Sequence, residues 1–454
     1  MKEYDVIVVG AGSTGTGIVF RALSAGFKTA LIEKGKVGGT CLNTGCVPSK
    51  MLIYPADRLI EIEEAKKLGI HADVKKVDFP RIMERMKTSV TLGRKFLKRE
   101  LRNSENLDFY DREAYFVDEY TLKIKGEKIR GKKIFIITGS RPAIPPVKGL
   151  DKTAYLTNEN LLELKRKPKS LVIIGGGYIA TEYAHFFSAM GTKVTIVETG
   201  ERLIQGEEPE IAELLKMELS RRMKIYTNTE TLGIRKARNG QVTLIRDRET
   251  GKEREITAEK IMVAAGRISN ADLLKVGNAG IETDERNFIR VDDFLMTNRE
   301  HIWALGDAIG RQMFTHAGDK EAEIAWHNAT NGDKVRMDFN AVPHAVFTHP
   351  QIASVGLTEK EAKKEHEILT GTAKYQDTVA GDTMAERDGF AKAVVEKNTG
   401  RILGLHIIGP YAPLIIQEAV NAIANNGVVK SITGCMHIFP TLSELIPDAL
   451  ENAG

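Results

Sequence analysis

The sequence has few cysteines and no long apolar run, and each shortage excludes a class of protein. Its 454 residues include 3 cysteines, too few for a framework of structural disulfides. No apolar run approaches the roughly 18 residues that a membrane-spanning helix needs. The first residues also lack the basic and then apolar order of an export signal. We therefore expect a cytoplasmic protein with no membrane span.

The sequence also lacks an excess of charge of either sign. Its 65 basic and 61 acidic residues almost balance, and the basic ones do not cluster with aromatics as in a nucleic-acid groove. The 10 histidines are scattered, and no set of residues has the spacing of zinc ligands. We expect neither a nucleic-acid partner nor a metal site. The length predicts about three domains.

The strongest pattern in the chain is an internal repeat. The copies that align without a gap are DVIVVGAGSTGTGIVFRALSAGFKTALIEKG from Asp5 and SLVIIGGGYIATEYAHFFSAMGTKVTIVETG from Ser170. Each copy reads as an apolar strand, a glycine-rich turn, a helix and a second apolar strand that ends in an acid. This is the pattern of a βαβ dinucleotide-binding unit.

Corresponding positions of the two copies have the same physical tasks. The first glycine makes the tight turn, the second lets the backbone approach a pyrophosphate, and the third small residue packs helix against strand. The acid accepts hydrogen bonds from ribose hydroxyls. The residues concerned are Gly10, Gly12, Gly15 and Glu33 in the first copy, and Gly175, Gly177, Ala180 and Glu198 in the second.

Two of the cysteines follow the first copy closely, in the segment GGTCLNTGCVPSK. Five steps of a regular helix rise about 7.5 Å, which exceeds the Cα separation of roughly 4.4 to 6.8 Å that a disulfide tolerates. A bridge between Cys41 and Cys46 therefore requires a distorted turn, which Gly45 and Pro48 permit. Such a strained bridge is readily reduced.

Further segments are expected as follows. A long charged helix covers Phe79 to Leu101, short strands cover Phe109 to Ile137, and a proline-rich linker covers Ser140 to Lys148. Leu414 to Asn426 has a helical pattern, in a C-terminal part that is otherwise strand-like.

The pattern G-G-T-C-x4-C-x-P-x-K resembles the redox-active segment of the pyridine nucleotide-disulfide oxidoreductases, such as dihydrolipoamide dehydrogenase, glutathione reductase and mercuric reductase. The resemblance covers essentially the whole chain. It extends to the segments around Gly139, Gly266 and Asp307, which are similar to the family's linking and cofactor-binding motifs, and to Phe347–Pro350.

This resemblance implies an α/β fold with two Rossmann-like dinucleotide-binding domains and a C-terminal α+β dimerisation domain. It places an FAD-binding domain at 1–145 and 272–337, an NAD(P)-binding domain at 146–271 and the dimerisation domain at 338–454. A homodimer is implied, in which NAD(P)H reduces FAD and the flavin opens the disulfide.

The resemblance also implies individual roles. Cys46 would lie next to the flavin and Cys41 would exchange with a small-molecule disulfide. Lys50 would lie close to the flavin and pair with Glu182, Asp307 would bind the FAD ribitol, and Tyr178 would cover the flavin.

The identity of the pyridine nucleotide depends on Glu198. A carboxylate at this position favours NADH over NADPH. Arg202 nearby weakens this preference, and Ala180 is more similar to an NADP enzyme.

The C-terminal segment departs from the family pattern. Aligned on Pro440, Thr441 and Glu444, the place of the family's catalytic histidine is taken by Phe439, which can neither accept nor donate a proton. His437 is a candidate substitute, although a structural role is favoured for it, and Glu444 keeps its place. We expect the third cysteine, Cys435, to be a buried small hydrophobe.

The leading hypothesis is therefore an FAD- and NADH-dependent disulfide reductase. The loss of the histidine leaves alternatives: reduction of a soft metal ion or a quinone, cleavage of a carbon–sulfur bond, or a slow flavin-bound redox sensor.

Overall fold

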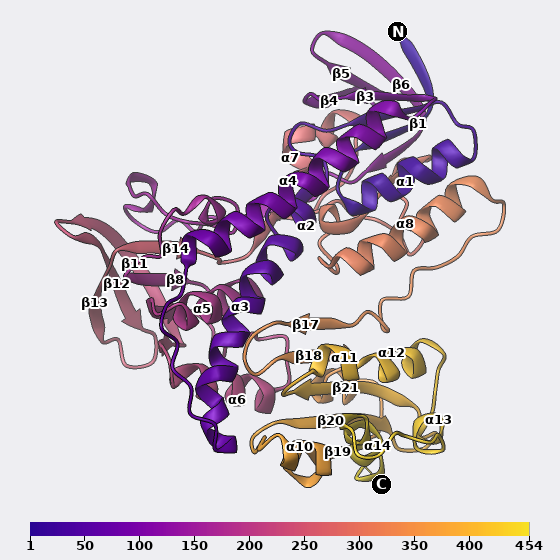
Figure 1. Cartoon of the computed structure of the whole chain (residues 1–454). Coiled ribbons are helices and arrows are strands. Elements are labelled where there is room, and N and C mark those ends of the chain that lie inside the picture. Colours follow the sequence, from indigo (N-terminus) through magenta and orange to yellow (C-terminus); the bar gives the residue numbers. More distant parts are fainter. Residues whose placement is uncertain (454) are drawn as a thin grey trace. The chain divides into compact units, whose positions relative to one another are not determined.

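The computed structural model describes residues 1–453, which form two compact units (Figure 1). Unit 1 comprises residues 1–49, 84–143 and 266–339; unit 2 comprises residues 50–83, 144–265 and those from 340 onward. No helix in the described chain is both long and apolar enough to cross a membrane. The division into three domains with the boundaries given above stays a prediction.

Unit 1 is built on the first repeat. The parallel strands β3, β2, β1 and β6 form its sheet, which the antiparallel strands β5 and β4 extend, and β16 pairs with β6. The strands are β1 (Lys2–Val9), β2 (Thr29–Ile32), β3 (Leu107–Tyr110), β4 (Ala114–Asp118), β5 (Thr121–Ile124), β6 (Glu127–Ile136) and β16 (Ile302–Ala304). Residues Val6–Val9 of β1 are buried, as expected of a parallel sheet covered on both faces.

Helices cover this sheet and carry the cysteines. Helix α1 connects β1 to β2 and packs against α8 (Figure 1). The helices of this part are α1 (Ser13–Ser24), α2 (Gly39–Asn43), α7 (Ala271–Leu274) and α8 (Thr315–Thr330). Helix α3 (Cys46–Glu64) belongs to unit 1 only up to residue 49, and α4 (Phe79–Asn103) belongs to it from residue 84. The predicted charged helix is thereby confirmed as α4, and the predicted short strands as β3 to β6.

The predicted linker has structure of its own. Its first residues form β7 (Ser140–Pro142), which pairs with β15 (Arg267–Ser269) in an antiparallel ribbon. Proline is tolerated there because it stands at the end of an edge strand.

The second repeat forms one part of unit 2. Its parallel sheet has the order β10-β9-β8-β14, so β8 and β9 pair as β1 and β2 do. An antiparallel sheet of β11, β12 and β13 follows. The elements are β8 (Ser170–Ile174), α5 (Tyr178–Ala189), β9 (Lys193–Val197), α6 (Pro209–Ser220), β10 (Lys224–Tyr226), β11 (Thr229–Ala237), β12 (Gly240–Asp247), β13 (Glu253–Ala258) and β14 (Lys260–Val263).

The C-terminal part is a five-stranded antiparallel sheet with the order β17-β18-β21-β20-β19. The predicted helix 414–426 is two short helices that meet at Ile416. The strands are β17 (His344–Val346), β18 (Ile352–Gly356), β19 (Ile368–Lys374), β20 (Phe390–Glu396) and β21 (Ile402–Ile408); the helices are α9 (Glu359–Ala362), α10 (Val379–Thr383), α11 (Ala412–Ile415), α12 (Gln417–Ala424), α13 (Val429–Thr433) and α14 (Leu445–Glu451).

Candidate active site

The glycines of the first turn are of two kinds: two are required by tight packing against the protein, and one faces open space. A Cβ atom on Gly10 would lie 2.1 Å from the Ile137 carbonyl oxygen, and one on Gly15 would lie 2.0 Å from that of Gly10. A Cβ on Gly12 would have only the Gly39 Cα nearby, at 3.9 Å. Protein packing therefore accounts for Gly10 and Gly15. The missing side chain of Gly12 leaves room for a phosphate at the start of α1, where no side chain caps the helix.

The acid of this repeat is held by the turn itself. Glu33 accepts the Ala11 N–H at 2.8 Å and the Gly35 N–H at 2.7 Å, one on each carboxylate oxygen. These bonds fix the carboxylate at the end of β2, and each oxygen keeps a lone pair for a ribose hydroxyl.

Asp307 lies in the same unit as this turn. Its Oδ2 accepts the Ser140 hydroxyl at 2.6 Å and lies 3.6 Å from the Arg267 guanidinium. Its other oxygen has no hydrogen-bond partner in residues 1–453. Gly139 precedes Ser140 with a left-handed φ of 67°. An extended dinucleotide with a polyol chain, such as FAD, fits this set of groups.

The second turn repeats the first. A Cβ on Gly175 would lie 2.3 Å from the Ala264 carbonyl oxygen, whereas one on Gly177 would meet no atom within 4 Å. Ala180 is fully buried in α5, and Tyr178 is the first residue of that helix. Gly266, which follows this part of the chain, has a φ of 116° and accepts the Ala143 N–H through its carbonyl.

The predicted ribose acid of this repeat, Glu198, is hydrogen-bonded to Gly200, which lines a hollow together with two arginines. Its Oε1 accepts the Gly200 N–H at 2.6 Å. The hollow has a volume of about 470 Å³ and includes Arg202 and Arg248 in its lining. The Arg248 guanidinium donates to the Thr199 carbonyl at 3.1 Å, and neither arginine has an ion pair in the described chain. Arg248 was not predicted, because the end of β12 is far from this repeat in sequence.

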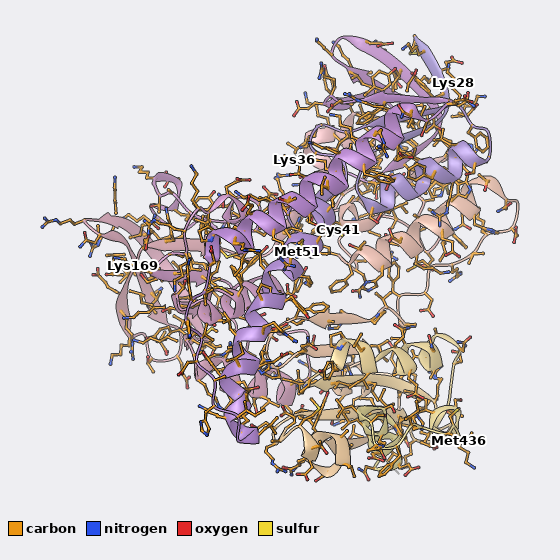
Figure 2. The ribbon with its side chains drawn as sticks, viewed as in Figure 1. Lys28, Lys36, Cys41, Met51, Lys169 and Met436 are labelled. Carbon is orange, nitrogen blue, oxygen red and sulfur yellow. The ribbon has the colours of Figure 1, made fainter. Side chains whose placement is uncertain are left out.

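Cys41 lies in α2 (Figure 2), and Cys46 is the first residue of α3, which follows α2 directly. The chain leaves the helical path at Thr44 and Gly45, which confirms the predicted distortion. A Cβ on Gly45 would lie 3.0 Å from the Thr40 carbonyl oxygen, so this close approach favours glycine. The structure describes the reduced form of the pair, in which Cys41 is hydrogen-bonded to Cys46.

The surroundings of the pair favour different protonation states for the two sulfurs. The hydrogen bond with Cys46, together with burial, raises the pKa of the Cys41 thiol well above its usual value. Cys46 is the first residue of α3, and a helix N-terminus favours negative charge. The Thr315 hydroxyl, at the start of α8, lies 3.5 Å from the Cys46 sulfur. The arrangement favours a proton on Cys41 and a negative charge on Cys46.

The predicted contact between Lys50 and Glu182 is confirmed. The Lys50 Nζ lies 2.8 Å from each oxygen of the Glu182 carboxylate, whose side chain is only 6% exposed. Glu182 also accepts the Phe347 N–H at 3.0 Å, and Lys50 lies 4.4 Å from the centre of the Phe347 ring. The ammonium is therefore held in a fixed position.

The C-terminal segment is irregular between α13 and Thr441. Phe439 is 69% exposed, whereas the His437 ring is mostly buried and lies 2.9 Å from a Glu418 carboxylate oxygen. Glu444 precedes α14, and its Oε2 is buried without a hydrogen-bond partner in the described residues. His437 thus has a carboxylate partner of its own, separate from Glu444.

The prediction for Cys435 was wrong. The residue is exposed, and its thiol donates to the Ser431 carbonyl at 3.4 Å. The neighbouring Met436 is fully exposed (Figure 2). Because α13 ends at Thr433, the following residues run over the surface and bury neither side chain.

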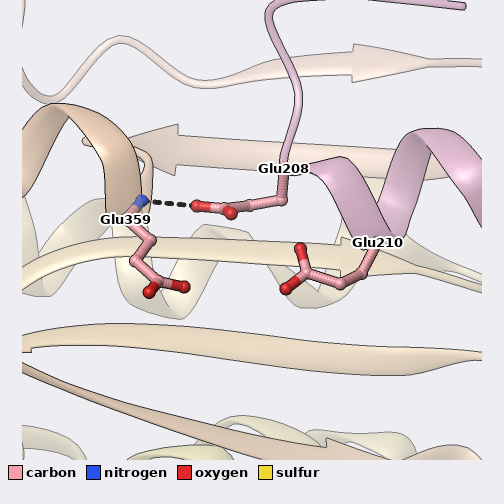
Figure 3. A group of neighbouring side chains, drawn as sticks. All are labelled: Glu208, Glu210 and Glu359. Atoms are coloured by element: carbon pink, nitrogen blue, oxygen red, sulfur yellow. Dashed lines mark hydrogen bonds between the residues drawn. The ribbon is translucent and has the colours of Figure 1, made fainter. Parts of the chain in front are cut away.

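A group of three carboxylates away from the cysteines shares one buried lysine. Glu208, Glu210 and Glu359 approach one another (Figure 3), and the buried Lys392 ammonium lies 2.9, 3.1 and 2.7 Å from them, respectively. Burial alone would lower the pKa of Lys392, but these carboxylates outweigh burial and raise it. We interpret the group as an internal ion pair network that joins α6 to β20.

Comparison with known proteins identifies the family. Residues 4–330 match the model described as pyridine nucleotide-disulphide oxidoreductase, and residues 342–450 match the dimerisation domain of that family. Dihydrolipoyl dehydrogenase from Synechocystis sp. is 33% identical over 475 residues, which cover 99% of each chain. Mercuric reductase from Lysinibacillus sphaericus is 32% identical over 443 residues, which cover 97% of this chain and 81% of that protein.

A solved structure has the same fold throughout. It is the Cu(II) complex of RclA from Escherichia coli, an HOCl-induced flavoprotein disulfide reductase, with a TM-score of 0.88 and 28% identity over 99% of both chains. The predicted fold class and activity are thereby confirmed. The chain belongs to the pyridine nucleotide-disulphide oxidoreductase family, as an enzyme that uses FAD and a pyridine nucleotide to act on sulfur.

Proposed function

We propose that the enzyme acts as a cytoplasmic homodimer that transfers electrons from NADH through FAD to Cys41 and Cys46, and from them to a small-molecule disulfide. The observation that carries this proposal is the contact between the two thiols, in the same compact unit as the first glycine turn. Bound FAD supplies the two-electron exchange between reduced nicotinamide and the sulfur pair.

The protein's own groups account for the exchange with substrate. The proton of the Cys41 thiol passes to the Cys46 sulfur, and the Cys41 sulfur attacks the substrate disulfide. The substrate S–S bond breaks and the first product thiolate leaves. Cys46 then loses its proton to water and attacks the Cys41 sulfur, which releases the second thiolate and closes the Cys41–Cys46 bridge. The substrate gains two electrons and the cysteine pair loses two.

The missing imidazole limits this sequence of steps. In this chain Cys46 is the proton acceptor hydrogen-bonded to Cys41, and Phe439 offers none. Each product thiolate must leave without a proton from a histidine. Disulfides of acidic thiols are therefore the favoured substrates, because a thiol of low pKa leaves faster.

Serine variants of the two cysteines test the proposal. We expect Cys41→Ser and Cys46→Ser each to retain FAD and to lose NADH-dependent disulfide reduction. Cys435→Ser is the matched control, since it removes an exposed thiol, and should retain the activity. Disulfide reduction at the wild-type rate by either of the first two variants would contradict the proposal.

NADH is the proposed donor because Glu198 stands where a carboxylate accepts bonds from the free ribose hydroxyl and repels a 2′-phosphate. Arg202 and Arg248 oppose this repulsion from the neighbouring hollow. We expect kcat/KM to be higher for NADH than for NADPH, and Glu198→Gln to narrow the difference. A wild-type preference for NADPH would contradict the assignment.

Reduction of a soft metal ion is a second candidate function. The exposed Phe439 favours it, because reduction of a metal ion held by two thiolates requires no proton for a leaving thiol: the two electrons of one NADH reduce one Hg(II) to Hg(0) or two Cu(II) to Cu(I). Mercuric reductase is among the relatives, and the similar E. coli structure is a Cu(II) complex of RclA. Anaerobic NADH oxidation driven by Hg(II) or Cu(II) at rates well above any disulfide would favour this candidate over disulfide reduction.

A further inference from the structure

Glu321 is a fully buried acid on α8 that the proposed chemistry does not use. Its side chain is 0% exposed. Its Oε2 accepts the Gly306 N–H at 2.6 Å, whereas its Oε1 is buried without a hydrogen-bond partner in the described chain. No lysine, arginine or histidine of residues 1–453 forms an ion pair with it. A buried carboxylate without a compensating charge is costly, so the site favours the neutral acid.

The surrounding charges add to this effect. Burial raises the pKa of Glu321 to about 7, the Gly306 N–H opposes that rise, Asp307 adds to it and Arg311 opposes it weakly. From the neighbouring α1, against which α8 packs, Thr14 approaches with an uncharged hydroxyl. The Arg21 guanidinium of α1 donates to a carbonyl of its own helix.

Glu321 lies on the helix that runs between the Cys46 sulfur and the turn formed by Gly306 and Asp307. The N–H that it holds belongs to Gly306, which has a left-handed φ of 62° and immediately precedes Asp307. Helix α8 also begins with Thr315, which contacts the Cys46 sulfur. A Cβ on Gly318, within the first turn of α8, would lie 2.4 Å from the Thr14 hydroxyl oxygen, so α8 is packed tightly at this point.

We propose that Glu321 is a positioning residue for FAD: as a neutral acid it fixes the Gly306–Asp307 turn, and loss of its proton loosens that turn and weakens FAD binding. Ionisation would place a second buried negative charge beside Asp307, with one oxygen already lacking a partner. The two carboxylates would then repel each other across the turn. This inference rests on the proposed role of Asp307 in holding the FAD ribitol.

The test is the pH dependence of FAD affinity, measured from the fluorescence of FAD released by dilute holoprotein. For the wild type we expect a constant dissociation constant below about pH 7 and a rise of up to about tenfold per pH unit above it, as for release of one proton. Glu321→Gln keeps an acceptor for the Gly306 N–H and cannot ionise. Its dissociation constant should stay near the low-pH wild-type value throughout.

Two controls separate this inference from the roles of other residues. Glu323→Gln removes an exposed acid of the same helix, which pairs with Lys320, and should keep the wild-type profile. Asp307→Asn should weaken FAD binding at every pH. If it does not, the proposed role of Asp307 fails. If it does, but Glu321→Gln retains the wild-type pH dependence, only the inference about Glu321 is overturned.

A second measurement needs no variant. Infrared spectra of the wild-type holoprotein should show a protonated buried carboxyl band that persists from about pH 6 to about pH 8, because FAD bound preferentially to the neutral acid raises the pKa of Glu321 further above its ordinary value. The absence of any such band across this range would also overturn the inference.

Discussion

Phe439→His restores the imidazole that the family pattern places before Pro440. The exposed position makes the substitution tolerable, because a side chain that is 69% exposed carries little packing energy. We expect stability to change by no more than about 0.5 kcal/mol. Glu444, the acid that accompanies this histidine in the family pattern, has a buried oxygen without a hydrogen-bond partner in the described residues.

The size of the gain follows from what a histidine adds. General acid–base assistance contributes about 10² to 10⁴ in rate. We expect the lower end, a gain of about 10²-fold in kcat/KM for lipoamide or glutathione disulfide, or about 3 kcal/mol. A gain is expected because the pKa of Cys41 is raised and its proton must be removed before the sulfur attacks. The gain should appear above about pH 6.5, where imidazole is neutral.

The assay is NADH oxidation with each disulfide across a pH series. Phe439→Gln is the matched control: it removes the ring without adding a titratable group and should gain nothing. Phe439→His combined with Glu444→Gln should gain less than the single variant, because the amide, unlike the carboxylate, has no charge to stabilise the protonated imidazole. An unchanged acceptor profile in Phe439→His would refute the reasoning and the alignment of this segment.

Three other predictions concern acceptor choice and stability. For the wild type, kcat/KM should rise steeply as the pKa of the leaving thiol falls across a series of disulfides, and Phe439→His should flatten this dependence. In urea titrations, Glu182→Ala should lower the free energy of unfolding by about 2 kcal/mol, because it leaves the Phe347 N–H and the partly exposed Lys50 without their acceptor. Glu61→Ala, at an exposed ion pair, is the control and should change that free energy by less than about 0.5 kcal/mol. Burial lowers the pKa of His185 to about 4, so as the pH falls below about 6.5 this side chain takes up a proton in the unfolded chain before it does in the folded protein. The free energy of unfolding of the wild type should therefore fall by about 2 kcal/mol through this group by pH 5. His185→Gln should reduce this loss.

The sequence was sufficient for the parts of the fold that local patterns determine. The two glycine turns, the strands beside them and the break between Cys41 and Cys46 follow from backbone geometry that a few consecutive residues dictate. The contact between Lys50 and Glu182 came from the family resemblance, since the two residues are far apart in the chain. Its confirmation shows that the family motif predicted a contact between residues that no local pattern relates.

Other features could not be predicted because they depend on tertiary packing. Thr315 reaches the Cys46 sulfur only because α8 begins there, and no pattern around it indicates this contact. Glu321 could have been suspected as an acid among the buried alanines of α8, but its unpaired oxygen is visible only in the structure. Cys435 was misjudged because average burial of cysteine was applied to a segment that follows a short surface helix.

An anaerobic titration with NADH tests the central claim most directly. The account predicts that each subunit consumes one NADH for its flavin and one more for the sulfur pair, with the appearance of two additional titratable thiols and a long-wavelength absorption from a thiolate beside the flavin. Cys41→Ser should consume only the first. If the wild-type flavin is reduced with no further uptake of NADH and no new thiols, electrons do not reach Cys41 and Cys46, and the account is contradicted.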